Sequence, residues 1–292
     1  MNSIKDITVT ENVSLKKFNT YKIDSTTKYF ISVKSIESLI ETLKYLREHN
    51  IKYFILGGGS NVILDNYFDG AVIKLDGPSY VKFNDFEVKA GASVMLARLA
   101  CETINHNLTG LEWCINIPGT LGGSIAGNAG AYNSEMFDNL ISIKVLTPAL
   151  EVVDMPKSAF EYSYRHTNIK AQNLIVLEGT FLLTRGNKKE SQALIQDRSE
   201  RRKASQPLDM PSAGSVFRNP EGDHAGRLIE AAGLKGKTIG GAMVSPKHAN
   251  FIVNNGGATS NDIKNLIKLI QKEVKAKFNV DLIAEQEIID WK

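Results

Sequence analysis

Apolar residues recur at helical spacing in several segments of the chain. Residues 35–50 predict an amphipathic helix behind a Ser35 N-cap, because five apolar side chains fall on one face: Ile36, Leu39, Ile40, Leu43 and Leu46. Residues 93–107, 188–205 and 259–278 are predicted as further helices.

Apolar segments of strand length alternate with these helices. Residues 52–56 predict a short strand that runs into glycines, and residues 71–75 predict a second strand. Residues 80–90 alternate around Asn84 and Asp85, which indicates a hairpin.

The rest of the chain continues this mixture of helices and strands. Residues 141–147 and 151–155 are a second hairpin candidate, and residues 173–184 predict a long strand. The helix at 188–205 stops before Pro207, which we interpret as the link to a last domain ending in a strand over 280–290.

Composition and charge narrow the function classes. With 292 residues, of which 42% are hydrophobic, the chain is long enough for two or three domains. A net charge of +3 does not suggest a general nucleic-acid binder, and the basic run at 198–203 contains an acidic residue, as solvated helix faces do.

The chain offers no signal for a membrane, a disulfide scaffold or a metal. We expect a cytoplasmic protein, because no apolar stretch approaches a membrane span and the N-terminus lacks a signal-peptide core. Cys101 and Cys114 are too few for a disulfide framework, and the histidines, among them His166, His224 and His248, show no metal-ligand spacing.

Two glycine-rich segments are candidates for cofactor binding. Residues 57–61 read GGGSN directly after a predicted strand, and backbone N–H groups without Cβ atoms can form a nest for a phosphate. A tight strand-ending turn is the alternative, because the full dinucleotide-binding fingerprint is absent. Residues 117–132 contain five glycines and favour an ordered loop against a flat or phosphorylated group, rather than a linker.

Three single residues are candidates for chemistry, and each has a structural alternative. Arg165 lies near two tyrosines and is suited either to a carboxylate or to surface stacking. Ser215 follows Gly214 outside any nucleophile-elbow pattern, so alone it indicates a loop hydroxyl. Glu285, predicted to share a strand face with apolar residues, is either a desolvated carboxyl group or an edge-strand charge.

The order of six segments resembles the UDP-N-acetylenolpyruvoylglucosamine reductase (MurB) family. These segments are LGGGSN, IPGTLGGSIAGNAGAY, YSYR, PSAGSVFRNP, GAMVSPKHANFIVN and EQEI, and together they extend over most of the chain. Each segment alone is a weak signal, whereas six in one order are specific.

The resemblance implies an α+β flavoenzyme. It would have a two-lobed FAD-binding region of the vanillyl-alcohol-oxidase/PCMH type and a C-terminal α/β substrate domain. The implied boundaries are 1–79 for the first FAD-binding lobe, 80–205 for the second, and 206–292 for the substrate domain. Related flavin folds often tether FAD through a histidine in the first glycine loop. Residues 57–61 contain none, so noncovalent FAD is expected.

The resemblance also implies the reaction. NADPH would reduce the flavin, and the reduced flavin would pass a hydride to UDP-N-acetylglucosamine enolpyruvate, giving UDP-N-acetylmuramate for peptidoglycan synthesis. The family's catalytic arginine, serine and glutamate fall on Arg165, Ser215 and Glu285, with Ser215 as the proton donor.

The remaining site residues also follow from the resemblance. Three residues are expected at the substrate: Tyr164, Arg218 and Asn219. Residues of the two glycine-rich segments are expected at the cofactor: Gly57, Gly58, Gly59, Ser60, Asn61, Pro118, Gly119, Thr120, Gly122, Gly123, Ser124, Gly127, Asn128, Ala129 and Gly130.

Two other functions remain as alternatives to the reductase. One is a flavin-dependent sugar or alcohol oxidase of the same fold, and the other is a non-catalytic nucleotide-binding sensor. The expected partners are NADPH and the sugar nucleotide, with no nucleic acid, membrane or obligate protein partner. The interval from Ser215 to Glu285 is too short for the tyrosine-bearing insertion of one family branch, so the chain resembles the shorter branch.

Overall fold

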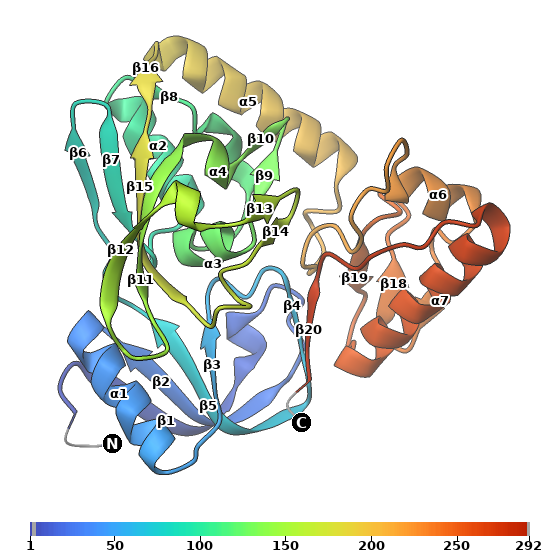
Figure 1. Cartoon of the computed structure of the whole chain (residues 1–292). Helices are drawn as coiled ribbons and strands as arrows, with labels where there is room; N and C mark the ends of the chain where they lie inside the picture. Colours follow the sequence, from blue (N-terminus) through green and yellow to red (C-terminus); the bar gives the residue numbers. More distant parts are fainter. Residues whose placement is uncertain (2–3, 291–292) are drawn as a thin grey trace. The chain divides into compact units, whose positions relative to one another are not determined.

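A computed structural model of the chain describes Met1 and residues 4–290 (Figure 1). The chain forms two compact units, and each consists of several chain segments. The larger unit comprises residues 1–10, 29–58 and 70–199, and the smaller unit comprises residues 11–28, 59–69 and 200–292. The predicted three-part division at 79/80 and 205/206 stays a prediction.

The first sheet combines four strands in the order β1-β2-β5-β3. The strands are β1 (Ile7–Ser14), β2 (Thr26–Val33), β3 (Tyr53–Leu56) and β5 (Tyr67–Leu75). Helix α1 (Ile36–Glu48) starts at the predicted Ser35 cap, where Ser35 and Ser38 form a reciprocal capping box. Its apolar face is buried in a core cluster with strands β2 and β5, so this predicted helix is confirmed.

The second sheet of the larger unit has five antiparallel strands in the order β12-β11-β15-β7-β6. They are β6 (Val81–Asn84), β7 (Glu87–Gly91), β11 (Leu140–Leu146), β12 (Val152–Pro156) and β15 (Ile175–Leu182). The β6–β7 and β11–β12 hairpins confirm both predicted hairpins. A second core cluster surrounds this sheet, while Leu146 of β11 and Leu177 of β15 belong to the cluster that contains α1.

Shorter elements complete the larger unit. Its other helices are α2 (Leu96–Asn105), α3 (Leu121–Ala126), α4 (Met136–Asn139) and most of α5 (Lys188–Ser205), whose last residues from 200 on belong to the smaller unit, with 3-10 turns at Glu112–Asn116 and Lys157–Ala159. Three two-stranded ribbons pair β8 (Leu108–Thr109) with β16 (Thr184–Arg185), β9 (Gly130–Ala131) with β10 (Ser134–Glu135), and β13 (Tyr162–Ser163) with β14 (His166–Thr167).

The smaller unit has a third core cluster, built mainly from the C-terminal segment. Its elements are a 3-10 turn at Leu15–Phe18, β4 (Val62–Leu64), α6 (Ala225–Ala231), β17 (Thr238–Ile239), β18 (Ala242–Val244), β19 (Ile252–Asn254), α7 (Ser260–Phe278) and β20 (Glu287–Ile289). Strands β17, β18 and β19 form an antiparallel sheet, and β20 pairs in parallel with β4.

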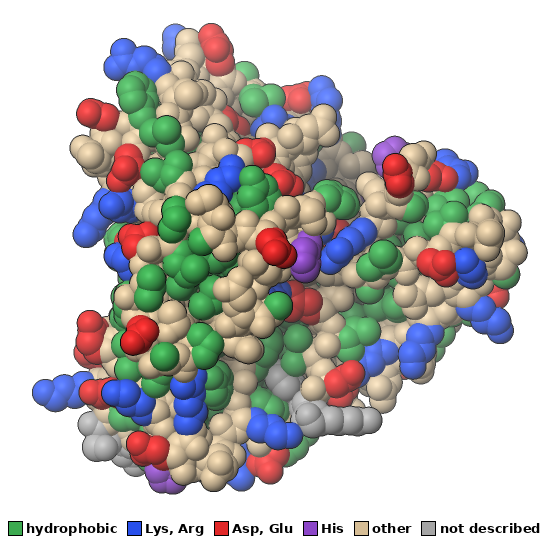
Figure 2. All heavy atoms as spheres, viewed as in Figure 1, with side chains coloured by type: hydrophobic (Ala, Val, Ile, Leu, Met, Phe, Trp, Pro, Cys, Tyr) green, Lys and Arg blue, Asp and Glu red, His purple; other side chains and the backbone are tan. Residues whose placement is uncertain are grey.

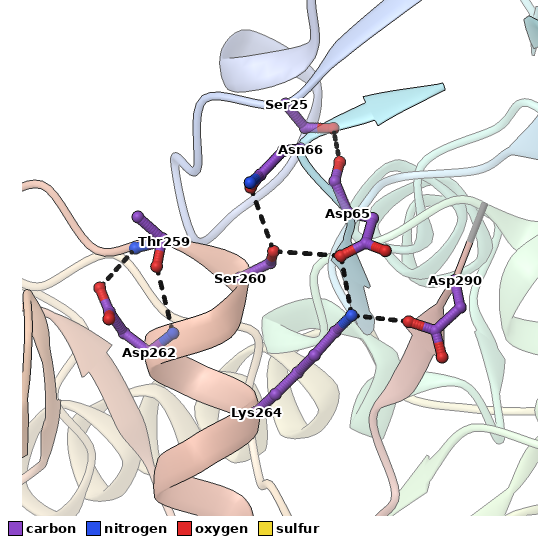
Figure 3. Close-up of polar contacts among 8 residues, drawn as sticks. All are labelled: Ser25, Asp65, Asn66, Thr259, Ser260, Asp262, Lys264 and Asp290. Atoms are coloured by element: carbon purple, nitrogen blue, oxygen red, sulfur yellow. Dashed lines mark hydrogen bonds and ion pairs between the residues drawn. The ribbon is translucent and has the colours of Figure 1, made fainter. Parts of the chain in front are cut away.

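Helix α7 is held at its N-terminus by a polar network (Figure 3). Thr259 caps the helix through a reciprocal box with Asp262. One turn further on, Lys264 Nζ contacts Asp65 Oδ1 at 2.8 Å and Asp290 Oδ1 at 2.6 Å. Asp65 follows β4 and Asp290 follows β20, so one lysine joins the ends of two paired strands.

Two expectations about local structure are wrong. The segment 117–132 is not a continuous loop, since it contains α3 and β9. The C-terminal strand covers only Glu287–Ile289, so Glu285 lies before it, and Ile283 is 61% exposed. Before Glu287 the chain has a different partner, since Ala284 forms an isolated antiparallel bridge with Phe217, and the parallel pairing with β4 covers only three residues.

The surface carries both charge signs. On the face shown in Figure 2, Lys and Arg side chains are interspersed with Asp and Glu side chains. Among residues 4–290 no helix is both long and apolar enough for a membrane span. The same residues contain no cluster of His, Cys, Asp and Glu that could hold a metal ion.

Candidate active site

The two glycine-rich segments meet inside the larger unit. A Cβ atom on Gly58, just after β3, would lie 2.6 Å from Gly119 Cα, so the two backbones approach as closely as glycines allow. Gly57 lies beside Thr120 and Gly123, and Lys74 Nζ donates to Gly57 O at 3.3 Å. The structure therefore brings together the two segments that sequence analysis assigned to one cofactor.

Two glycines of this region have free space where a side chain would be. A Cβ on Gly123 would meet only Thr120 Oγ1, at 3.7 Å, and one on Gly127 would meet only Gly123 O, at 3.5 Å. By contrast, Cβ atoms on Gly122 and Gly130 would contact neighbouring protein atoms at 2.9 and 2.4 Å. An open backbone at Gly123 and Gly127 suits a flat ligand, so these residues fit a cofactor such as FAD.

Other predicted cofactor residues hold the protein together. Asn128 is fully buried, and its amide donates to Ser163 O at 2.9 Å and accepts from Phe137 N. Ser124 is buried and donates to Thr120 O. In the smaller unit, Thr20 N donates to Gly59 O, and a Cβ on Gly59 would clash with Phe18.

Arg165 is anchored to the 117–132 segment within the larger unit. It occupies the turn between β13 and β14 with a φ of +58°, and its Nη2 donates to Gly130 O at 2.6 Å. Thr167 Oγ1 donates to Ala126 O at 2.7 Å. The half-exposed Tyr164 ring lies 5.3 Å from the Arg165 guanidinium carbon. Arg165 and its neighbour Thr167 are thus hydrogen-bonded directly to the candidate cofactor segment.

Ser215 and Glu285 lie on neighbouring chain segments of the smaller unit. Glu285 N donates to Val216 O at 2.8 Å, and Arg218 N donates to Ile283 O at 3.0 Å. A bridge between Phe217 and Ala284 continues this antiparallel contact. The two candidate residues, 70 positions apart, are therefore brought together by backbone pairing.

Asn250 forms hydrogen bonds to the Ser215 segment, and Asn61 forms hydrogen bonds to the Glu285 segment. The Asn250 amide makes two hydrogen bonds with the Phe217 backbone, and Asn250 O accepts from Val216 N. Asn61 Nδ2 donates to Glu285 O at 3.1 Å, and Asn61 O accepts from Glu287 N. Asn61, which we expected at the cofactor, is thus bonded to the Glu285 segment.

The polar groups near Ser215 differ in whether they have a hydrogen-bond partner within the protein. Ser215 is half-buried, and within the described part of the chain its hydroxyl has no hydrogen bond. Arg218 Nε is buried and has no acceptor among the same residues. Asn219 Oδ1 accepts from Ala225 N at the start of α6, so its side chain supports a helix end.

Sequence reasoning missed two buried residues beside Ser215. Gln286 and Tyr21 form a hydrogen bond in the interior of the smaller unit. Gln286 lies in the EQEI segment, but no local pattern connects it with Tyr21, which is 265 positions away.

Comparisons with known proteins divide the chain into an FAD-binding part and a C-terminal part. Residues 27–155 match an FAD binding domain, and residues 206–289 match the UDP-N-acetylenolpyruvoylglucosamine reductase C-terminal domain. The fold is thus that of an FAD-binding region joined to a C-terminal domain of this type.

Full-length relatives give the same result. A UDP-N-acetylenolpyruvoylglucosamine reductase of Caldanaerobacter subterraneus subsp. tengcongensis is 41% identical over 96% of this chain and 93% of its own length. One of Lactobacillus helveticus is 40% identical over 97% of this chain and 95% of its own. The crystal structure of UDP-N-acetylenolpyruvylglucosamine reductase (MurB) from Thermus caldophilus has a TM-score of 0.83 at 31% identity, covering 97% of this chain and 100% of that one. With relatives this similar over nearly its whole length, the chain belongs to the UDP-N-acetylenolpyruvoylglucosamine reductase family.

Proposed function

We propose that this protein reduces UDP-N-acetylglucosamine enolpyruvate to UDP-N-acetylmuramate, with NADPH as the reductant and noncovalent FAD as the cofactor. In balance, NADPH gives two electrons and a hydrogen as hydride, and the enolpyruvyl double bond takes up that hydride and one proton. FAD, when bound, supplies the hydride-transfer chemistry.

The observation that carries the proposal is the pairing of the Ser215 and Glu285 segments. Glu285 N bonds to Val216 O at 2.8 Å, so a hydroxyl and a carboxyl group from distant segments are fixed on adjacent backbone. Because hydride addition builds negative charge on the carbon beside the substrate carboxylate, a proton donor is needed there. Ser215 Oγ is the donor in our proposal.

Arg165 and Glu285 support the proton transfer in different ways. The planar guanidinium of Arg165 suits two carboxylate oxygens at once and offsets the developing charge. Its anchoring by Gly130 O keeps it beside the segment that fits the cofactor. Glu285 does not serve as a bare anion next to that charge. It acts protonated, as a hydrogen-bond donor, or by orienting Ser215.

Three further residues are proposed to bind the sugar nucleotide. Arg218, whose buried Nε lacks an acceptor among the described residues, would donate to an anionic oxygen of the substrate. Tyr164 and Asn219 are exposed enough to contact the substrate. The cytoplasmic location expected from the sequence also remains a proposal.

The test separates the two halves of the reaction by stopped-flow absorbance of the flavin. Wild-type protein should be yellow, bleached by NADPH and recoloured by the enolpyruvyl sugar nucleotide. Ser215→Ala should keep bleaching near the wild-type rate but recolour about 10²-fold more slowly or worse, the scale of a lost general acid. Equal slowing of both halves would remove Ser215 from proton transfer.

The two alternative functions predict different changes of flavin absorbance in the same experiment. Bleaching by a sugar or alcohol without NADPH would replace the reductase with an oxidase. A protein that binds the nucleotide but shows no turnover would be a sensor.

A further inference from the structure

A buried polar pair lies directly behind the loop that carries Ser215. Gln286 is 3% exposed and Tyr21 is fully buried. Tyr21 donates its hydroxyl hydrogen to Gln286 Oε1 at 2.8 Å. Gln286 Nε2 then donates to Ala213 O at 3.1 Å and to Gly214 O at 3.2 Å, the two carbonyls that precede Ser215.

The side-chain amide of Gln286 is fully hydrogen-bonded. Both N–H groups and the oxygen of Gln286 have partners, so burying the amide in an apolar cluster leaves no unsatisfied atom on it. Burial raises the pKa of Tyr21, although its hydrogen bond to Gln286 opposes this rise. The phenol is therefore a neutral donor across the physiological pH range.

The geometry constrains the residue next to Ser215. Gly214 has a φ of +75°, and the space where a Cβ would lie is open, so this residue has no side chain of its own to anchor it. A planar amide that binds two consecutive carbonyls fixes the peptide planes on both sides of Gly214. The hydrogen bonds from Gln286 thus restrain the backbone at this glycine.

Gln286 is also the sequence neighbour of the second candidate residue, Glu285. It directly follows Glu285, whose N–H bonds to Val216 O. Its side chain holds the residues before Ser215, while the neighbouring backbone holds the residue after it. Tyr21 is itself anchored, because Asn254 Nδ2 donates to Tyr21 O at 2.8 Å.

We propose that Gln286, supported by Tyr21, is a positioning residue that holds Ser215 in place for proton transfer. The inference rests on the proposed function, since it assigns Gln286 an effect on the proton-transfer half of that reaction. It makes no claim of contact between Gln286 and substrate or cofactor.

The test compares Gln286→Met with Tyr21→Phe and with Gln271→Met as a matched control. Gln271 lies on α7 in the same unit and also donates to a backbone carbonyl, Leu282 O at 3.0 Å, and among the described residues it makes no hydrogen bond to residues 213–216. Flavin content and thermal unfolding are measured first. If Gln286→Met does not fold, Tyr21→Phe, which keeps the ring in place, carries the test.

Three readouts distinguish positioning from general stability. Gln286→Met should slow substrate-driven recolouring by about 10- to 100-fold, as small displacements of a reacting group do, with NADPH bleaching changed less than about twofold. Its solvent deuterium isotope effect on recolouring should rise. Hydrogen exchange should be faster at residues 213–216. Tyr21→Phe should slow recolouring by about 2- to 10-fold, the equivalent of one net hydrogen bond.

The outcomes are separable. If Gln286→Met or Tyr21→Phe recolours as fast as Gln271→Met, with unchanged exchange at 213–216, the positioning inference is overturned. If wild-type protein is not recoloured by the sugar nucleotide, the proposed function fails instead, and the exchange data still decide whether Gln286 holds the loop.

Discussion

At Gly58 the backbone of the neighbouring segment leaves no room for a side chain, whereas at Gly123 the space is open. A side chain at Gly58 would contact Gly119 before it could obstruct a cofactor. Gly58→Ala should therefore separate the two glycine-rich segments, lowering both FAD content and the unfolding temperature.

Gly123→Leu should act on FAD alone. Gly123 lies in helix α3, where leucine is favoured over glycine by roughly 0.5–1 kcal/mol, so the apoprotein should be no less stable than wild type. The FAD content after purification should fall because the side chain enters the open space. Calorimetry of the apoprotein and flavin absorbance check both parts. Full FAD retention would remove Gly123 from the cofactor contacts.

His248 should make stability depend on pH. Burial, with a smaller effect of Lys235, lowers its pKa below 6.5, while its backbone hydrogen bond and Glu230 act in the opposite direction. The unfolded chain thus binds the proton more tightly, and unfolding becomes easier as pH falls from 6.5 through the folded-state pKa. Protonation would also break the bond from Asn250 N to His248 Nδ1.

The measurement is the unfolding temperature between pH 7.5 and 5. His248→Gln should show a flatter decline over this range than wild type. Parallel curves for the two proteins would mean that His248 titrates alike in both states.

At the scale of elements, Lys264 of α7 joins the ends of the β4–β20 pair (Figure 3). Its side chain is 15% exposed, so its two ion pairs are less screened than surface pairs. Lys264→Met leaves Asp65 and Asp290 without this cation. It should lower the free energy of unfolding by about 1–3 kcal/mol, between typical surface and buried pairs.

The same helix provides the control. Lys275 pairs with Asp281 at 2.7 Å, but both side chains are largely exposed. Lys275→Met should change the free energy of unfolding by less than about 1 kcal/mol. Urea denaturation of the two variants compares them directly, and equal losses would contradict a special role for Lys264.

At the scale of the whole molecule, FAD should be bound without a covalent link. Residues 57–61 contain no histidine that could tether the flavin. Denaturation in mild acid or heat, followed by ultrafiltration, should leave the yellow flavin in the filtrate. Flavin that stays with the precipitated chain would show a covalent attachment elsewhere.

The sequence by itself determined the elements whose signals are local. The face of α1 and its Ser35 cap, the capping box of α7, and the turn at Asp85–Phe86 depend on residues within a few positions of one another. Family membership also followed from the sequence, because six short motifs in one order can be recognised without knowing which residues they contact.

Only the tertiary structure decided which distant residues meet. The backbone bond between Glu285 and Val216, the approach of Gly58 to Gly119, and the Tyr21–Gln286 pair join positions about 60 to 265 apart. The C-terminal strand shows the same limit, since its apolar residues do not reveal that the chain pairs with Phe217 at Ala284 and with β4 from Glu287 onward. Periodicity and caps fix what a segment becomes, whereas the path of the whole chain fixes what that segment faces.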